Sequence, residues 1–190
     1  ANPRALVSFK LSLQMLPHIR TLLREVKAPL PQELVEQMDS LEDLAELLES
    51  ALVEDPPITI REGGMIREGY SEKADQLRQA KTDGKNWLAQ LEQQERERTG
   101  IKNLRIKFNK VFGYYLEVTN SFKNLVPEDY IRKQTLTNAE RYTTPQLKEL
   151  EDVILGAEDK LFALEYDLFC EIRDKIGAQV VRIQSTAKAV

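Results

Sequence analysis

Residues 145–169, PQLKELEDVILGAEDKLFALEYDLF, carry the longest periodic pattern in the chain. Apolar side chains in this stretch recur at steps that alternate between three and four, at positions 147, 150, 154, 157, 161, 164 and 168. This repeat is typical of the seam of a left-handed coiled coil, and Pro145 suits the first turn of a helix. We therefore predict a helix over about 146–184, roughly 58 Å long at 1.5 Å per residue.

A helix of that length needs a partner that covers its apolar seam. Residues 70–98 provide one, because apolar or small residues recur there at heptad spacing and Gly100 follows as a stop signal. The two helices flank residues 102–143, so we expect them to run antiparallel. In the returning helix, Gly156 and Gly177 allow either a close approach or a bend, and the longer steps after Leu168 predict a flex point.

The N-terminal quarter of the chain predicts two further amphipathic helices. The first helix begins near Pro3, with a second helix start expected at Pro17. The second helix covers residues 34–52. Proline cannot continue a helical hydrogen-bond ladder, so Pro56 and Pro57 end that helix. A short extended segment is expected at residues 58–60, before a glycine turn.

Between the two long helices the apolar period changes to that of a β-strand. Residues 104–108 alternate apolar and polar, a turn follows at 109–113, and residues 114–119 are aromatic and β-branched. This pattern predicts a β-hairpin with one buried face, and a third strand is expected near 135–143. The predicted fold is mainly α: a helical body with a long antiparallel helical pair that carries an inserted small β-sheet.

The β-rich tip is basic although the chain is acidic. The net charge is −4, whereas residues 102–142 contain eight lysines and arginines against four aspartates and glutamates, which makes the tip +4 and the remainder −8. Cations gain by displacing counterions from phosphates, so the tip favours a polyanion, although an excess of this size also suits a solvated surface. Residues 130–142 add Gln, Thr and Asn side chains that can donate hydrogen bonds to phosphate oxygens.

Several function classes are excluded by composition. Cys170 is the only cysteine and His18 the only histidine, which rules out a disulfide framework and a Cys/His zinc site. No stretch approaches the roughly 20 apolar residues that span a bilayer. The chain begins without Met, and both ends interrupt helix-like patterns, which indicates a segment of a longer protein.

Five short motifs occur in a specific order and spacing: IREGY at 66–70, ERERTGI at 95–101, NKVFGYYLEV at 109–118, RKQTL at 132–136 and NAERY at 138–142. Together they resemble the MutS family of bacterial DNA mismatch-repair proteins. The resemblance extends over essentially the whole chain. One departure is Gln146, which stands where the family more often has Glu and should affect only the start of the helix.

The resemblance implies a core (lever) domain with a clamp domain inserted in it. Residues 1–64 would form the first part of the lever. Residues 65–144 would form a lever helix and the clamp, with its β tip at about 102–143, and residues 145–190 would form the returning lever helix. In such proteins a dimer encircles DNA, and the levers carry the state of an ATPase to clamps that touch the DNA backbone. The mismatch-reading domain would precede this segment, and the ATPase would follow it.

The same analogy, together with residue chemistry, gives the candidate DNA-binding residues. Phosphate contacts are expected from the β tip, at Arg132, Lys133, Gln134, Thr137 and Asn138, with Lys110 and Asn109 of the hairpin turn as second choices. Each could instead cap the sheet or hold the lever junction. Arg141 is interpreted as structural, paired with an acidic neighbour near the start of the helix.

No catalytic residues, cofactor or metal site are expected in this segment, since it lacks the phosphate-loop pattern G-x-x-x-x-G-K-[ST]. The resemblance places ATP and magnesium in an ATPase domain outside it. It also implies double-stranded DNA, a second copy of the parent protein and a downstream repair protein as partners, no membrane, and a cytoplasmic, nucleoid-associated location. The alternative is a coiled-coil protein-interaction module whose basic tip binds an acidic partner protein.

Overall fold

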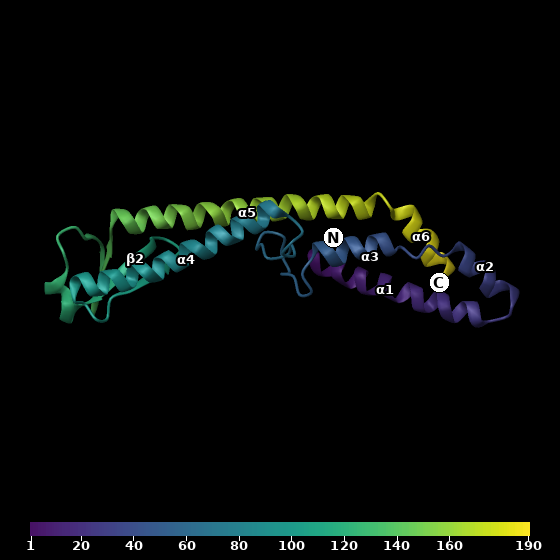
Figure 1. Ribbon diagram of the computed structural model, residues 1–190, viewed down its shortest axis with the longest axis horizontal. Helices are drawn as coiled ribbons and strands as arrows, with labels where there is room; N and C mark the ends of the chain where they lie inside the picture. The colour runs from purple at the N-terminus through teal and green to yellow at the C-terminus, as the bar shows by residue number, and fades with distance from the viewer. The chain divides into compact units, whose positions relative to one another are not determined.

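The computed structural model describes all 190 residues, which form two compact units (Figure 1). Unit 1 comprises residues 1–74 and 161–190, and unit 2 comprises residues 75–160. Helices α4 (Glu72–Thr99) and α5 (Pro145–Gly177) contribute residues to both units. The expectation of a mainly α fold with a small inserted sheet is confirmed, because one four-stranded antiparallel sheet lies between α4 and α5 in the sequence.

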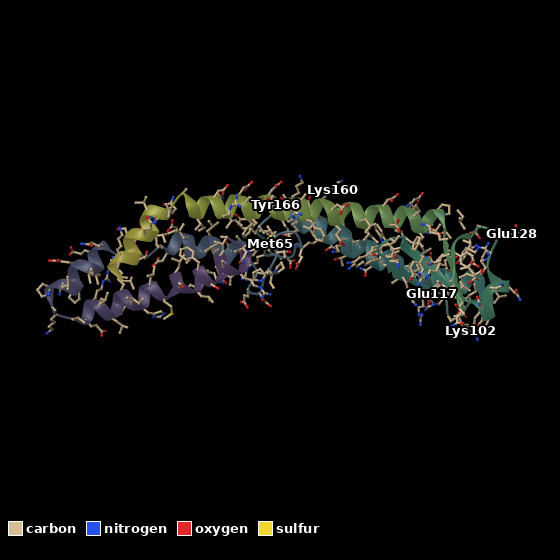
Figure 2. The ribbon with its side chains drawn as sticks, turned by 180° about the vertical axis from the view of Figure 1, so that it is seen from behind. Met65, Lys102, Glu117, Glu128, Lys160 and Tyr166 are labelled. Carbon is tan, nitrogen blue, oxygen red and sulfur yellow. The ribbon has the colours of Figure 1, made fainter.

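Unit 1 is helical around a leucine-rich core. It contains α1 (Pro3–Glu25), α2 (Pro29–Gln37), α3 (Glu42–Ala51), α6 (Val180–Ala189) and the second half of α5. The Oδ1 atom of Asn2 accepts a hydrogen bond from the Ala5 amide at 2.8 Å and so caps α1. Contrary to the expected second entry at Pro17, α1 continues through this proline. The core includes Leu48, Leu52, Met65 (labelled in Figure 2), Phe169 and Ile172.

The helix predicted over residues 34–52 is wrong as a single element, because α2 ends at Gln37 and α3 begins at Glu42. Leu41 between them takes a left-handed conformation with φ of 50°, and its amide donates to Asp39 Oδ1 at 2.9 Å. The other oxygen of Asp39 accepts from Arg182 at 2.7 Å. A carboxylate used in this way competes with the helical hydrogen-bond ladder, so the apolar period continues while the helix does not.

Residues 58–60 lie in turns rather than in the extended segment that was expected. The extended contact is instead a bridge between Leu52 and Ile66, which is flanked by a hydrogen bond from the Arg67 amide to the Ala51 carbonyl at 2.8 Å. The prolines at 56–57 do follow the end of α3, as predicted.

The returning helix is also shorter than predicted. It ends at Gly177, and α6 begins at Val180 after a turn in which the Gln179 amide donates to the Ile176 carbonyl at 3.0 Å. Gly177 therefore marks a break, which was one of the two roles considered for it. Within unit 1 the predicted seam positions Leu161, Ile172 and Ile176 of α5 are buried, whereas Glu165 and Phe169 are buried in place of the predicted Leu164 and Leu168.

Unit 2 places its sheet beside the two long helices (Figure 1). The strands are β1 (Arg105–Asn109), β2 (Gly113–Thr119), β3 (Ile131–Thr135) and β4 (Ala139–Thr143), in the order β1-β2-β4-β3, with the short 3-10 helix η1 (Asn120–Leu125) after β2. The predicted hairpin is confirmed as β1 and β2. The further strand expected near 135–143 is confirmed in β4, but it is shorter than predicted, because Leu136–Asn138 form a turn that separates it from β3, a strand that was not predicted.

The inner face of the sheet packs on the helices. Leu116, Val118 and Tyr142 share one buried cluster with residues of both helices, including Leu88 of α4 and Leu147 of α5. The first part of α5 runs antiparallel to α4 within this unit, as shown by two pairs of facing residues: Lys81 with Glu158 at 2.9 Å, and Gly84 with Ile154. Gly84 allows this approach, because a Cβ atom there would lie 2.5 Å from Ile154 Cγ1.

Gly84 and Gly156 provide a matched test of that close approach. Both are helical glycines, but a Cβ at Gly156 would meet nothing within 4 Å. We expect Gly156→Ala to raise Tm by about 2–4 °C, because alanine favours a helix over glycine by about 1 kcal/mol. We expect Gly84→Ala to leave Tm unchanged or lower it, because Ile154 must move. Thermal melts followed by circular dichroism measure both, and equal stabilisation by the two changes would contradict this packing.

Candidate functional site

The outer face of the sheet, opposite the helices, carries polar and charged residues. Side chains alternate across a strand, so Tyr115 and Glu117 of β2 point away from the buried cluster that holds Leu116 and Val118. On the neighbouring strands, Lys107 of β1 pairs with Tyr115, and Arg141 of β4 pairs with Glu117. We call this surface, made by the outward residues of all four strands, the outer face.

Glu117 lies at the centre of the outer face between two cations. Its Oε1 atom accepts from Lys107 Nζ at 2.6 Å, and its Oε2 atom is 3.5 Å from Arg141 Nε. The hydrogen bond from Lys107 holds the pKa of the Glu117 carboxyl below its usual value, and the same bond raises the pKa of Lys107. Arg141 also donates to Gln134 at 2.9 Å and stacks 4.4 Å from the centre of the Tyr115 ring.

Arg141 is thus held by neighbouring strands, and the interpretation of this residue as structural is confirmed. The prediction of its acidic partner is wrong, however, because that partner, Glu117, lies on β2 and not near the start of the helix. Tyr115 and Tyr142 are both buried, at 5% and 6% exposure, so neither ring is free to stack on a base.

The predicted contact residues of β3 do not share one face. A β-bulge between Arg132 and Gln134 leaves Lys133 as the extra residue. The Arg132 side chain is 63% exposed and lies 3.6 Å from Glu140 on the inner side of the sheet edge. Gln134 is opposite Arg141, whose hydrogen bond occupies its oxygen. Lys133 is exposed and reaches the carbonyl of Phe112 at 3.4 Å.

The hairpin turn gives Lys110 and Asn109 different environments. Asn109 Oδ1 accepts from the amides of Val111 at 2.8 Å and Phe112 at 3.3 Å, so this side chain builds the turn. Lys110 is exposed, and the neighbouring Val111 side chain is 81% exposed. Because Lys133 also reaches Phe112, we group it with residues 109–113 and call this set the hairpin-turn end of the sheet.

Thr137 and Asn138 lie at the opposite end of the strands, in the exposed β3–β4 turn. Asn120 at the start of η1 binds both of their carbonyls, at 2.9 and 3.0 Å. On the neighbouring strand end, Asn103 donates to Thr119 at 2.6 Å. We call this group, residues 102–103, 119–123 and 136–138, the η1 end of the sheet.

The η1 end contains site candidates that sequence reasoning did not choose. Lys102 and Lys123 are exposed and make no ion pair with a carboxylate. The same end of the sheet also carries hydroxyl and amide side chains. Both lysines contribute to the positive charge of the tip, but neither is among the predicted DNA-binding residues. The polar run Thr119-Asn120-Ser121, which begins at the last residue of the predicted strand, was the available signal, because such residues concentrate where a strand turns.

Three helix glutamates hold the sheet in place. Glu92 of α4 accepts from the Ile106 amide at 2.7 Å, and Glu151 of α5 accepts from the Tyr114 amide at 2.6 Å. Glu95 of α4, 8% exposed, accepts from the hydroxyl of Tyr130, whose pKa rises through burial and this bond. The carboxylates nearest the sheet are therefore occupied by its own backbone and side chains.

No group of three or more His, Cys, Asp or Glu side chains is arranged to hold a metal ion. None of the helices has the length and apolar character needed to cross a membrane.

Comparisons with known proteins agree on one family. Residues 69–160 match the family model described as MutS family domain IV. Over all 190 residues the chain is 63% identical to the DNA mismatch repair protein MutS of Lachnoclostridium phytofermentans and 52% identical to that of Acetivibrio thermocellus. Over 189 residues it is 56% identical to that of Caldanaerobacter subterraneus. The chain spans 20% to 22% of the length of these relatives.

The buried pair of Glu140 and Tyr142 on β4 predicts a pH-dependent stability. The Tyr142 hydroxyl donates to Glu140 and lowers the pKa of that carboxyl, while burial and the carboxylate raise the pKa of Tyr142 to about 12. A carboxyl whose pKa is depressed by folding stabilises the protein above its unfolded pKa, near 4.5, and loses that contribution as the pH falls through the folded value. Glu140→Gln should therefore lower Tm by about 2–4 °C at pH 7.

The difference in Tm between wild type and Glu140→Gln should decrease as the pH falls below 4.5 and through the lowered pKa of Glu140. Thermal melts at pH 3, 5 and 7 measure it. A difference that stays constant over this range would show that the Glu140 charge contributes nothing.

Proposed function

Since this chain belongs to the MutS family of DNA mismatch-repair proteins, we propose that it contacts the backbone of double-stranded DNA, without sequence preference, through the cations of its sheet. The proposal rests on the pairing and burial of the acidic residues in segment 102–142. Glu117 is paired with Lys107, Glu140 is buried, and Asp129 is paired with Arg98 at 3.1 Å. Lys102, Lys110, Lys123 and Lys133 are exposed and make no ion pair, so their charge remains available to a phosphate.

Two groups of side chains are suited to phosphate contact. At the hairpin-turn end they are Lys110 and Lys133, and at the η1 end they are Lys102 and Lys123 with the polar groups of Thr137 and Asn138. Arg132 adds an exposed guanidinium on the β3 edge. Gln134 and Asn109 have their oxygens occupied, which leaves only their NH₂ groups to donate.

Contacts of this kind position a duplex but do not read its sequence. Base readout in the major groove needs a helix or a two-stranded ribbon that enters the groove. In unit 2 the helices cover the inner face of the sheet, and the cations lie on strand edges and turns. This arrangement supports backbone contact, and recognition of a mismatch would fall to other parts of the parent protein.

We propose further that the helical pair acts as a lever. α5 is unbroken from Pro145 to Gly177, and its packing against α4 at Gly84 supports a stiff connection. The ATPase that drives this lever, with its ATP and magnesium, and the second subunit of a DNA-encircling dimer would be provided by the longer parent protein. The chain itself would not hydrolyse ATP, because it has no G-x-x-x-x-G-K-[ST] motif.

One observation favours a protein partner as the second candidate. Val111 is 81% exposed and Phe112 41% exposed at a turn that also presents Lys110 and Lys133. Apolar side chains flanked by lysines suit an acidic protein surface with an apolar centre.

The DNA proposal is tested by anisotropy titrations of a fluorescent homoduplex and a mismatched duplex at several salt concentrations. We expect equal affinity for the two duplexes, and a decrease of log K with log salt of about 0.9 for each phosphate contact. A preference for the mismatch, or binding that does not respond to salt, would contradict backbone contact.

The two ends of the sheet are compared with paired variants. Lys102→Gln with Lys123→Gln, and Lys110→Gln with Lys133→Gln, should each reduce the salt slope by up to about 2 and weaken binding to both duplexes alike. Replacement of Arg132 and Lys133 by Ala tests the β3 assignment. The matched control is Lys27→Gln with Lys175→Gln, which removes the same charge from exposed residues of unit 1 and should leave the slope unchanged.

A further inference from the structure

Cations on the outer face and at its hairpin-turn end are of two kinds. Lys110 and Lys133 have no carboxylate partner, whereas Lys107 and Arg141 share Glu117, and Arg105 pairs with Glu92 of α4 at 3.4 Å.

By strand register, the other outward residues of β1, β2 and β4 are Arg105, Asn109, Tyr115, Thr119, Ala139 and Thr143, none of them acidic. Glu117 is thus the one acidic residue among the outward residues of these strands.

The pairing with Glu117 is close and partly shielded from water. The Glu117 side chain is 19% exposed, against 50% for Lys107, and the two atoms are 2.6 Å apart. A phosphate approaching Lys107 must therefore compete with a carboxylate already in place, and it meets the negative charge of Glu117 as well.

We propose that Glu117 is a negative determinant of DNA affinity, an internal counterion that limits how strongly the outer face holds a duplex. This inference rests on the proposed DNA contact. Glu117 cancels one of the two positive charges of Lys107 and Arg141 and occupies Lys107 Nζ. These two cations therefore add less to the salt-dependent attraction than their number implies, and most of it is left to the unpaired lysines at the two ends of the sheet.

The test is Glu117→Gln, which keeps the size of the side chain and removes its charge. Duplex binding is measured by anisotropy at 0.05 to 0.2 M salt. We expect Kd to fall by about three- to tenfold at 0.1 M salt, from the lost repulsion and one added phosphate contact, and the salt slope to rise by up to about 0.9.

The matched control is Glu128→Gln, which changes the net charge of the same unit equally. Glu128 is exposed, has no ion pair, and lies well apart from Glu117 in Figure 2. It should shift Kd by less than twofold. An equal gain from both variants would mean that net charge alone acts, and would overturn the proposal.

A second comparison places Lys107→Gln in two backgrounds. In wild type it should weaken binding only slightly, because Glu117 already occupies Lys107, whereas in the Glu117→Gln background it should abolish the gain. An equal loss from Lys107→Gln in the two backgrounds would overturn the proposal. Wild-type binding without salt dependence would overturn the DNA contact itself, whereas salt-dependent wild-type binding with no gain in Glu117→Gln would overturn only the role of Glu117.

Discussion

An open sheet of four strands leaves one apolar face and its edge groups to be covered, and unit 2 depends on how α4 and α5 cover them. Leucines of both helices bury the inner face, and Glu92 and Glu151 each bind a backbone amide of the β1–β2 hairpin. A buried amide without a partner is costly, so these carboxylates are as necessary as the apolar contacts. Gly113 is part of the same arrangement, because a Cβ there would clash with Glu151 at 2.1 Å. The position of the hairpin follows from this contact.

The same contacts explain why the sheet can present positive charge in an acidic chain. Apart from Glu117 on the outer face and the exposed Glu128, the carboxylates near the sheet bind backbone amides, tyrosine hydroxyls or arginines. Exposed lysines remain on the turns, where no glutamate reaches them. Ion pairs at a solvated surface contribute little to stability. The division of the sheet's cations into paired and unpaired ones therefore matters because it decides which cations stay available to a phosphate.

Prediction from sequence succeeded where the spacing of apolar residues determines the structure. It failed where a polar side chain occupies a buried position or breaks a helix. The long helices, the hairpin and the stop at Gly100 follow from periodicity and from glycine conformation, and Gly100 does take a positive φ of 72°. Glu165 occupies a fully buried position on α5 because its carboxylate accepts from the Gly64 amide, which shifts the predicted seam by one residue. The break at residues 38–41 has the same origin in Asp39. The DNA-binding residues stay a prediction. Residue chemistry selected cationic and polar side chains for them, whereas their distribution between the two ends of the sheet depends on register and on the bulge at Lys133.

The sequence by itself determined the helix–sheet–helix order, the basic segment between the helices and, through five spaced motifs, the family. These properties are local or additive, since periodicity, charge and motif spacing need no knowledge of distant contacts. Only the tertiary structure decided which charges are neutralised. Glu117 meets Lys107 and Arg141 because three strands align in one register, and Glu92, Glu95 and Glu151 meet the sheet because the helices pack on it. Electrostatic energy falls with distance in space and not along the chain, so a count of lysines and glutamates cannot give the charge that a phosphate would meet.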